Sequence, residues 1–202
     1  HVDFTYEVMK SLAACEGALL LVDASQGIEA QTVANYYLAI ESNLEIIPVI
    51  NKIDISGVDI ENVKKELVDI LRFKEQDIIL ASAKEAIAID DILERVVNFI
   101  PAPSGNEDAP LRALIFDSTF DIYKGVIIYL RIFDGKVSVG QAVKMMHSTK
   151  EYKIEEVGVF KPQTEKIESL SCGEVGYITC NIREPAEVII GDTVTDVKNP
   201  TS

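Results

Sequence analysis

The chain has 202 residues, of which 48% are hydrophobic and 26% are charged, and its formal net charge is −14 at pH 7. This length allows one large or two modest domains with a sizeable core. The acidic balance argues against broad, non-specific binding to nucleic acid, so DNA is not an expected partner. No apolar run approaches the roughly 20 residues of a membrane span. Residues 1–16 also lack the basic and apolar segments of a signal peptide.

The cysteines and histidines give no sign of a metal site. Cys15, Cys172 and Cys180 form no CxxC pair, and the chain has only two histidines. We therefore expect neither a zinc site nor a disulfide framework. Free cysteines of this kind favour a reducing compartment such as the cytoplasm.

The first hundred residues alternate predicted helices with short apolar strands that end in polar residues. Helices are expected at 3–16, 28–41, 59–71 and 89–99, and strands at 18–23, 46–50 and 77–81. In the third helix, Asp59 is the expected N-cap, and the predicted buried stripe consists of Val63, Leu67, Ile70 and Leu71. Alternation of this kind indicates right-handed βαβ units and therefore an α/β domain with a parallel sheet.

The most informative stretch is the strand Ile46–Ile50, which runs directly into Asn51-Lys52-Ile53-Asp54. Its uninterrupted apolar character is typical of a strand that is covered on both faces. Ligands of such sheets bind beyond the carboxyl ends of the strands. A second polar segment, Ser82-Ala83-Lys84, follows the next predicted strand, so the two segments are expected at the same edge.

These residue types fit the hydrogen-bonding groups of guanine, which offers N1–H and an amino group as donors and O6 and N7 as acceptors. The carboxylate of Asp54 can accept both donors, and Asn51 can support N7. The stem of Lys52 fits over one face of the base, Lys84 can approach the other, and the Ala83 amide can donate to O6. Either segment alone is a weak signal, and both can be chance loop sequences. Together and in this order they predict guanine binding.

The phosphate-binding part of a nucleotide site is missing from the sequence. A P-loop requires G-x-x-x-x-G-K-[ST], and the Gly135-Lys136 pair has Leu130 where the first glycine belongs. Asp23 also follows a strand, but a turn role is favoured for it over metal binding.

The second half of the chain has a different pattern. Short strands are expected at 111–116, 126–133, 143–146, 151–157, 176–180 and 188–194, with a hairpin at Asp134-Gly135. Evenly spaced short strands with glycine turns predict a small closed antiparallel β-barrel. Pro, Gly and polar residues mark 101–108 as a linker. The predicted division is therefore 1–100, the linker 101–108, a barrel at 109–195 and a tail at 196–202.

Several segments resemble translational GTPases in both order and spacing. They are His1-Val2-Asp3-Phe4, Ser11 to Ala18, Val22-Asp23-Ala24 through Gln31-Thr32, Asn51 to Asp54, and Ser82 to Lys84. The runs 44–54, 109–118 and 157–160 resemble the LepA, or elongation factor 4, branch more than elongation factor G or BipA. The resemblance covers essentially the whole chain.

The resemblance implies the C-terminal part of a P-loop-GTPase-type domain followed by the barrel called domain II. It implies GTP or GDP with Mg²⁺ in the intact protein, and GTP hydrolysis on the ribosome during protein synthesis. His1 matches the histidine that orients the attacking water in the family. The chain would begin one residue after the Asp-x-x-Gly loop and lack the P-loop, the magnesium-contacting segments and the first three strands. We therefore expect it not to hydrolyse GTP alone. From the residues alone, a non-catalytic guanine-binding or RNA-docking module stays open.

The family's domain II touches small-subunit ribosomal RNA. The lysines that could contact phosphates here are Lys144, Lys150, Lys153, Lys161 and Lys166, although each also fits a solvated surface. The family implies a cytoplasmic protein, with peripheral association at the cytoplasmic face of the membrane suggested for it. Without the preceding strands, the strand Ala18–Val22 would be an open edge, which predicts self-association or disorder there.

The sequence departs from the family pattern after the second polar segment. Ala86 and Ala88 stand where glycine is common, and Ser56 stands where proline is common. Alanine resists positive φ angles, so this loop is predicted to be strained or shifted.

Overall fold

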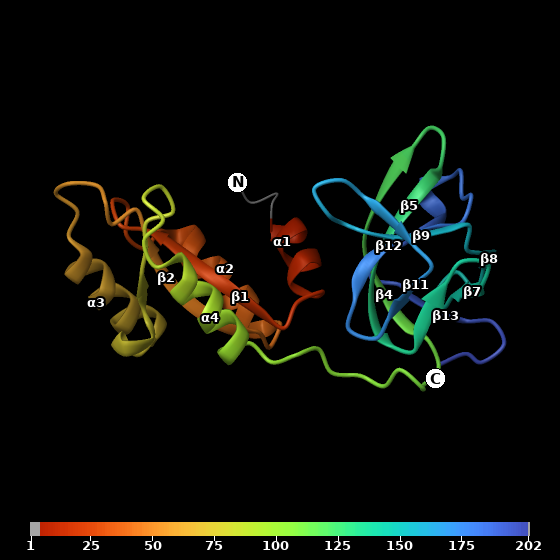
Figure 1. The fold of residues 1–202 in the computed structure, drawn as a ribbon, viewed down its shortest axis with the longest axis horizontal. Coiled ribbons are helices and arrows are strands. Elements are labelled where there is room, and N and C mark those ends of the chain that lie inside the picture. The colour runs from red at the N-terminus through yellow and green to blue at the C-terminus, as the bar shows by residue number, and fades with distance from the viewer. Residues whose placement is uncertain (1–4, 202) are drawn as a thin grey trace. The chain divides into compact units, whose positions relative to one another are not determined.

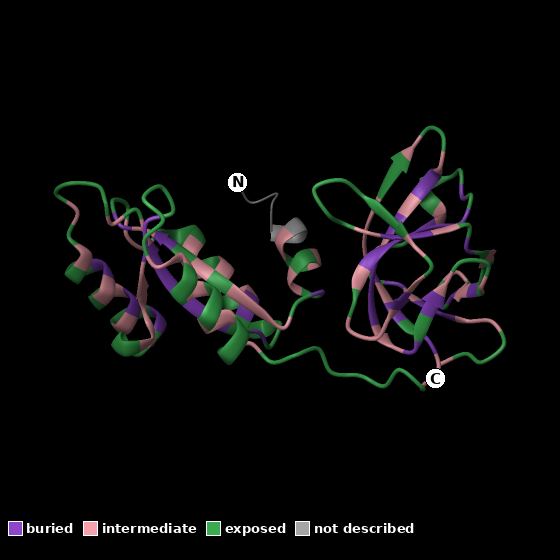
Figure 2. Ribbon diagram, viewed as in Figure 1, coloured by how far each residue is buried: buried purple, intermediate pink, exposed green. Residues whose placement is uncertain are grey.

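The structure, a computed structural model, describes residues 5–201. The chain divides between Ala102 and Pro103 into two units, each with its own hydrophobic core. The first unit is α/β and the second is all-β (Figure 1). In both units the buried residues gather inside, on the sheet and the inner faces of the helices or within the barrel (Figure 2).

The first unit is a parallel sheet with helices on both faces, as predicted. Its helices are α1 (Thr5–Leu12), α2 (Ala30–Glu41), α3 (Ile60–Leu71) and α4 (Ile89–Phe99), and its strands are β1 (Gly17–Asp23), β2 (Glu45–Asn51) and β3 (Ile79–Leu80). The strand order is β1-β2-β3, and both pairings are parallel.

Strand β2 is central and buried on both faces. Ile50 packs with α3 residues in one cluster, whereas Ile47 and Val49 pack with the inner side of α4 in another. Successive side chains of a strand point to opposite faces, so an uninterrupted apolar run is what two covered faces require. Strand β2 is therefore packed on both faces up to the residue before Asn51.

Helix α3 follows the prediction except at one residue. Asp59 caps it by accepting a hydrogen bond from the Asn62 amide at 3.0 Å. Val63, Leu67 and Leu71 are buried at a spacing of four residues. Ile70 was predicted to be buried and is 48% exposed. That prediction was wrong because the buried stripe of α3 is narrow: residues four apart, Val63, Leu67 and Leu71, make it up, and Ile70 lies beside it.

Two other predicted elements are shorter than expected. Helix α1 ends at Leu12 rather than near Glu16, and the bonds that follow, such as Cys15 N to Leu12 O, span three residues instead of four. Strand β3 does not begin at Asp77, because Glu75–Asp77 forms a short 3₁₀ helix.

The second unit is a small antiparallel β-barrel, as predicted. Its strands are β4 (Arg112–Asp121), β5 (Gly125–Asp134), β6 (Lys136–Ser138), β7 (Ala142–Met145), β8 (Glu151–Lys153), β9 (Glu156–Val159), β10 (Glu165–Ile167), β11 (Ser169–Ser171), β12 (Val175–Thr179) and β13 (Thr193–Asp196). Eight of them form a sheet in the order β10-β9-β12-β5-β4-β13-β7-β8, and β11 pairs with β6. One apolar cluster fills the interior.

The predicted hairpin at Asp134-Gly135 was wrong. Gly135 does turn the chain, with φ at +69°, but β5 pairs with β4 and β12 while β6 pairs with β11. The amide of Gly135 donates to the carbonyl of Asn106 instead. Hairpins in the barrel instead join β4 to β5, β7 to β8 and β9 to β10.

Other strand boundaries in the barrel also differ from the prediction. The run predicted at 151–157 forms two strands, β8 and β9, which pair with different neighbours. The last strand begins at Thr193 rather than at Val188, because the chain turns at Ile190 and Gly191, where Gly191 has φ at +91°.

The segment predicted as a linker is partly attached to the barrel. Asn106 donates its amide hydrogen to Asp134 Oδ1 at 2.9 Å. A Cβ on Gly105 would lie 1.9 Å from the Phe133 carbonyl oxygen, so the backbone runs directly over β5 there. The predicted domain boundaries stay a prediction.

Candidate nucleotide-binding site

The two polar segments meet at the carboxyl edge of the parallel sheet. Asn51 ends β2 and lies in register with Asp23, the last residue of β1. Ser82 follows β3 after one intervening residue, Ala81, whose amide donates to Ile50 O at 2.8 Å. The structure thus brings together all six predicted binding residues, Asn51, Lys52, Asp54, Ser82, Ala83 and Lys84. This edge is where ligands of open α/β sheets bind.

Asp54 and Ser82 form the central contact between the two segments. The buried Ser82 hydroxyl donates to Asp54 Oδ1 at 2.5 Å and accepts from the Glu85 amide at 3.2 Å. The exposed ammonium of Lys84 lies 3.8 Å from Asp54 Oδ2. The hydrogen bond from Ser82 is the main reason that the pKa of Asp54 is lowered. Asp54 is therefore an ionised acceptor whose Oδ2 can accept further donors.

A second contact joins Asn51 to the segment after β3. The Ala83 amide donates to Asn51 Oδ1 at 3.1 Å. Because the carbonyl side of the Asn51 amide is used here, its NH₂ group is left as the donor side. The side chain is thereby oriented by the neighbouring loop.

Lys52 contacts a residue that the sequence did not assign to the site. Its Nζ lies 2.6 Å from Asp23 Oδ2, and its backbone is left-handed, with φ at +67°. The predicted turn role of Asp23 is confirmed, because Oδ1 accepts bonds from the Ser25 amide and hydroxyl. The ammonium of Lys52, together with Ser25, lowers the pKa of Asp23 to about 2. The signal in the sequence was that Asp23 ends one predicted strand and Lys52 follows shortly after the end of the next.

The loop after Lys84 is strained, as predicted. Ala86 and Ala88 have φ angles of +54° and +58°. The loop closes tightly, since Ser82 and Ile87 exchange two backbone hydrogen bonds of 3.2 and 2.9 Å. The two alanines thus occupy a region that favours glycine.

The other predicted functional residues are His1 and five lysines of the barrel. His1 lies outside the described residues. Of the barrel lysines, Lys150 pairs with Glu187, Lys161 with Glu165 and Lys166 with Glu156. Lys144 and Lys153 lie on the adjacent strands β7 and β8.

Within residues 5–201, no group of three or more His, Cys, Asp or Glu side chains is placed to hold a metal ion. None of the helices in the same range has the length and apolar character that crossing a bilayer requires.

Comparison with known families agrees with both units. The family model described as Elongation factor Tu GTP binding domain matches residues 1–102, and that of Elongation factor Tu domain 2 matches residues 125–195.

Individual relatives are similar along the whole chain. An Elongation factor 4 from Geobacillus thermodenitrificans is 54% identical over 202 residues, which is 100% of this chain and 33% of the relative. Those of Aquifex aeolicus and Fusobacterium nucleatum are each 54% identical, over 201 and 200 residues, which cover 100% and 99% of this chain and 34% and 33% of the relatives. The chain thus spans about a third of the length of the curated relatives it matches. It belongs to the elongation factor 4 family of translational GTPases.

Proposed function

We propose that this chain supplies the guanine-reading part of a GTPase that works on the ribosome in the cytoplasm. The whole protein, with Mg²⁺, would bind GTP or GDP and hydrolyse GTP during protein synthesis. The observation that carries the proposal is the pair of cross-links between the strand ends, Ser82 to Asp54 and Ala83 to Asn51. They fix a carboxylate and a carboxamide together at the edge where ligands bind.

Asp54 has the properties that recognition of guanine requires. It is ionised, it is held by Ser82 through one oxygen, and the exposed ammonium of Lys84 lies 3.8 Å from its other oxygen. A fixed carboxylate can accept both N1–H and the amino group of guanine. Adenine has no matching pair of donors on that edge, so it would leave the Asp54 carboxylate without the two hydrogen bonds that guanine supplies.

The neighbouring groups complete the proposed contacts with the base. The donor side of Asn51 suits the acceptor N7. The stem of Lys52 leans toward β1 and Lys84 lies beyond β3, so the base would lie between them. The Ala83 amide already donates to Asn51. It would reach O6 by sharing its hydrogen between the two acceptors.

Hydrolysis is assigned to the whole protein rather than to this chain. We propose that His1 orients the attacking water there, as its match to the family implies. The 202 residues contain no P-loop sequence, so nothing in them can hold the phosphates as that motif does. The chain alone should show no magnesium-dependent GTP turnover, and measurable turnover would refute this.

Replacing Asp54 by Asn tests the base-reading role. The change puts a donor where guanine needs an acceptor, so in the whole protein GDP affinity should fall about 100-fold or more. Affinity for xanthosine diphosphate should rise, because xanthine presents an acceptor at that position. Competition against a fluorescent nucleotide measures both changes.

A matched control is available in the same domain. Asp59→Asn makes the same chemical change at the N-cap of α3, where Asn also caps well. It should leave nucleotide selectivity unchanged. Unaltered GDP preference in Asp54→Asn would remove Asp54 from the proposed site.

We propose Lys144 and Lys153 as the ribosomal RNA contacts of the barrel. They lie on one face of the β7–β8 pair, since Lys153 is opposite Ala142 and Lys144 is two residues further along. Lys150, Lys161 and Lys166 are instead held by carboxylates.

Salt dependence tests this assignment. For the whole protein and isolated small ribosomal subunits, each lost phosphate contact should reduce the slope of log affinity against log salt by about 0.7 to 0.9. Lys144→Ala should show this reduction, and Lys161→Ala is the matched control. Equal slopes for the two variants would contradict the assignment.

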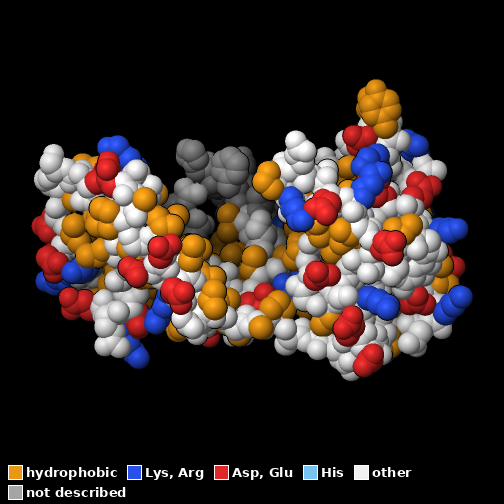
Figure 3. All heavy atoms as spheres, viewed as in Figure 1, with side chains coloured by type: hydrophobic (Ala, Val, Ile, Leu, Met, Phe, Trp, Pro, Cys, Tyr) orange, Lys and Arg blue, Asp and Glu red, His pale blue; other side chains and the backbone are white. Residues whose placement is uncertain are grey.

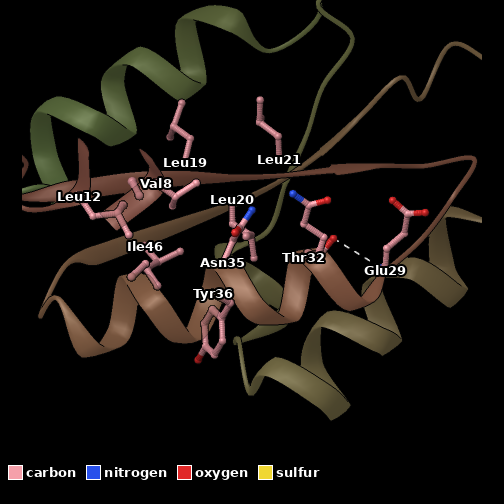
Figure 4. A pocket seen from close by; sticks show the side chains of 13 residues that line it. Val8, Leu12, Leu19, Leu20, Leu21, Glu29, Thr32, Asn35, Tyr36 and Ile46 are labelled. Carbon is pink, nitrogen blue, oxygen red and sulfur yellow. Dashed lines mark hydrogen bonds between the residues drawn. The ribbon is translucent and has the colours of Figure 1, made fainter. Parts of the chain in front are cut away.

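We also propose that the isolated chain self-associates through β1. Within the described residues, β1 pairs only with β2, which leaves its other edge open to a second copy. Figure 4 shows Leu19 and Leu21 on the α4 side of the sheet, with Leu20 on the α2 side beside Leu12 and Ile46. Hydrophobic side chains are also visible on the surface of this unit (Figure 3).

A further inference from the structure

The ends of β1 and β2 are tied together just before Lys52. Asp23 and Asn51 are register partners, and the Ala24 amide donates to the Asn51 carbonyl at 2.9 Å. Lys52 therefore leaves β2 beside the end of β1. Its side chain does not extend freely into solvent from this point.

The Asp23 carboxylate is the fixed partner in its ion pair with Lys52. The Asp23 side chain is 17% exposed and that of Lys52 is 55% exposed, with Nζ 2.6 Å from Oδ2. The other oxygen, Oδ1, is held by the Ser25 amide at 2.8 Å and the Ser25 hydroxyl at 2.7 Å. Because both oxygens are engaged, the carboxylate cannot rotate without breaking a bond.

A turn alone does not account for this arrangement. The hydrogen bonds of the turn use Oδ1, and Asn forms turns of this kind as well. The turn does not need Oδ2, which lies against the Lys52 ammonium. Lys52 in turn has a positive φ angle, which non-glycine residues adopt uncommonly. Unusual backbone angles of this kind cluster at functional sites, so the ion pair between Asp23 and this residue points to a functional role.

We infer that Asp23 is a positioning residue for guanine recognition, which holds the Lys52 side chain on the β1 side of the site and thereby preorganises the Asn51–Asp54 loop. This rests on the proposed function, since the loop must be the one that reads guanine. It gives Lys52 a defined place before nucleotide arrives. A preorganised site binds more tightly because less ordering remains for the binding step.

The test measures binding of a fluorescent GDP to the whole protein and its variants. Asp23→Asn keeps the turn but removes the charge, and should weaken binding about 3- to 10-fold, the size of coupling between contacting residues. Asp59→Asn, the control, makes the same chemical change at the N-cap of α3 and leaves the Asp23–Lys52 ion pair intact, so affinity should stay within about twofold of wild type.

The double variant separates positioning from a structural role. In a Lys52→Met background, Asp23→Asn should cause no further loss, because the residue through which Asp23 acts is gone. Additive losses, an unchanged affinity in Asp23→Asn, or an unchanged affinity in Lys52→Met would each overturn the inference. Wild-type protein that shows no saturable GDP binding would instead refute the proposed function.

A second readout needs no nucleotide. In NMR spectra of the 202-residue chain, Asp23→Asn should shift the Lys52 and Asn51 amide resonances more than Asp59→Asn does. Identical Lys52 resonances in wild type and Asp23→Asn would show that the charge does not position this loop.

Discussion

Single residues carry strain beside the proposed guanine site, and Ala88 is the clearest case. It is the N-cap of α4 with φ at +58°. Glycine adopts this conformation without the Cβ penalty and is accepted at N-caps. We expect Ala88→Gly to stabilise the first unit by about 0.5 to 1 kcal/mol, measured by urea unfolding of the chain.

The control for this prediction is the same substitution where the backbone is helical. Ala34 is exposed in the middle of α2. Ala34→Gly should destabilise by about 1 kcal/mol. If Ala88→Gly raises the free energy of unfolding and Ala34→Gly lowers it, the strain lies at Ala88. If both variants lower it, the prediction of strain at Ala88 is wrong.

The residues of the site were more predictable than their contacts. Asn51, Asp54 and Ser82 could be placed because each follows an apolar run at a strand end. The pairing of Lys52 with Asp23 depends on how β1 and β2 align. Both residues stand at predicted strand ends, but neither segment contains the alignment of β1 with β2 that brings Lys52 to Asp23.

Whole elements were predictable where the signal is local. Helix α4 and the buried strand β2 follow from periodicity and apolar runs, which depend on neighbours within a few residues. The partner of β6 was not predictable in this way. Gly135 marks a turn correctly, but β6 pairs with β11, more than thirty residues later in the chain. Turn residues indicate where the chain changes direction, but they do not indicate which strand the next strand pairs with.

Strand β9 provides a prediction at this scale, because Glu156 links it to three neighbours. Its carboxylate accepts bonds from Lys124 near β5, Lys166 on β10 and Tyr177 on β12. Burial alone would raise the pKa of Glu156, but these three donors outweigh it and bring the pKa to about 2. Glu156→Gln should therefore destabilise the barrel by about 1 to 2 kcal/mol at pH 7.

The pH dependence of this effect has a definite sign. A carboxyl whose folded pKa is lowered contributes stability above its unfolded pKa, near 4.5, and loses it as pH falls toward about 2. The difference in free energy of unfolding between wild type and Glu156→Gln should therefore become smaller as the pH falls. Hydrogen exchange of the barrel amides can measure this difference. Glu165→Gln, at an exposed pair with Lys161, should cost less than about 0.5 kcal/mol. If Glu156→Gln and Glu165→Gln destabilise the barrel equally, Glu156 does not have the proposed stabilising role.

At the scale of the whole molecule, the two units have separate cores and separate tasks in the proposal. The guanine-reading groups all belong to the first unit, and the proposed RNA contacts belong to the barrel. Asp54→Asn should therefore alter nucleotide binding and leave ribosomal RNA binding unchanged, whereas Lys144→Ala should do the reverse. The family models also match the two units separately.

The proposed self-association of the chain depends on the free edge of β1, which pairs only with β2 within the described residues. Leu19 and Leu21 are 41% and 59% exposed on this strand. An exposed apolar edge pairs readily with another strand, and a lysine on it opposes that pairing. We expect the isolated chain to form concentration-dependent dimers in sedimentation experiments, and Leu21→Lys to shift it to monomer. Val139→Lys places the same charge at a 48% exposed position in the barrel and should leave the dimer intact. A wild-type chain that stays monomeric at high concentration would exclude pairing through β1.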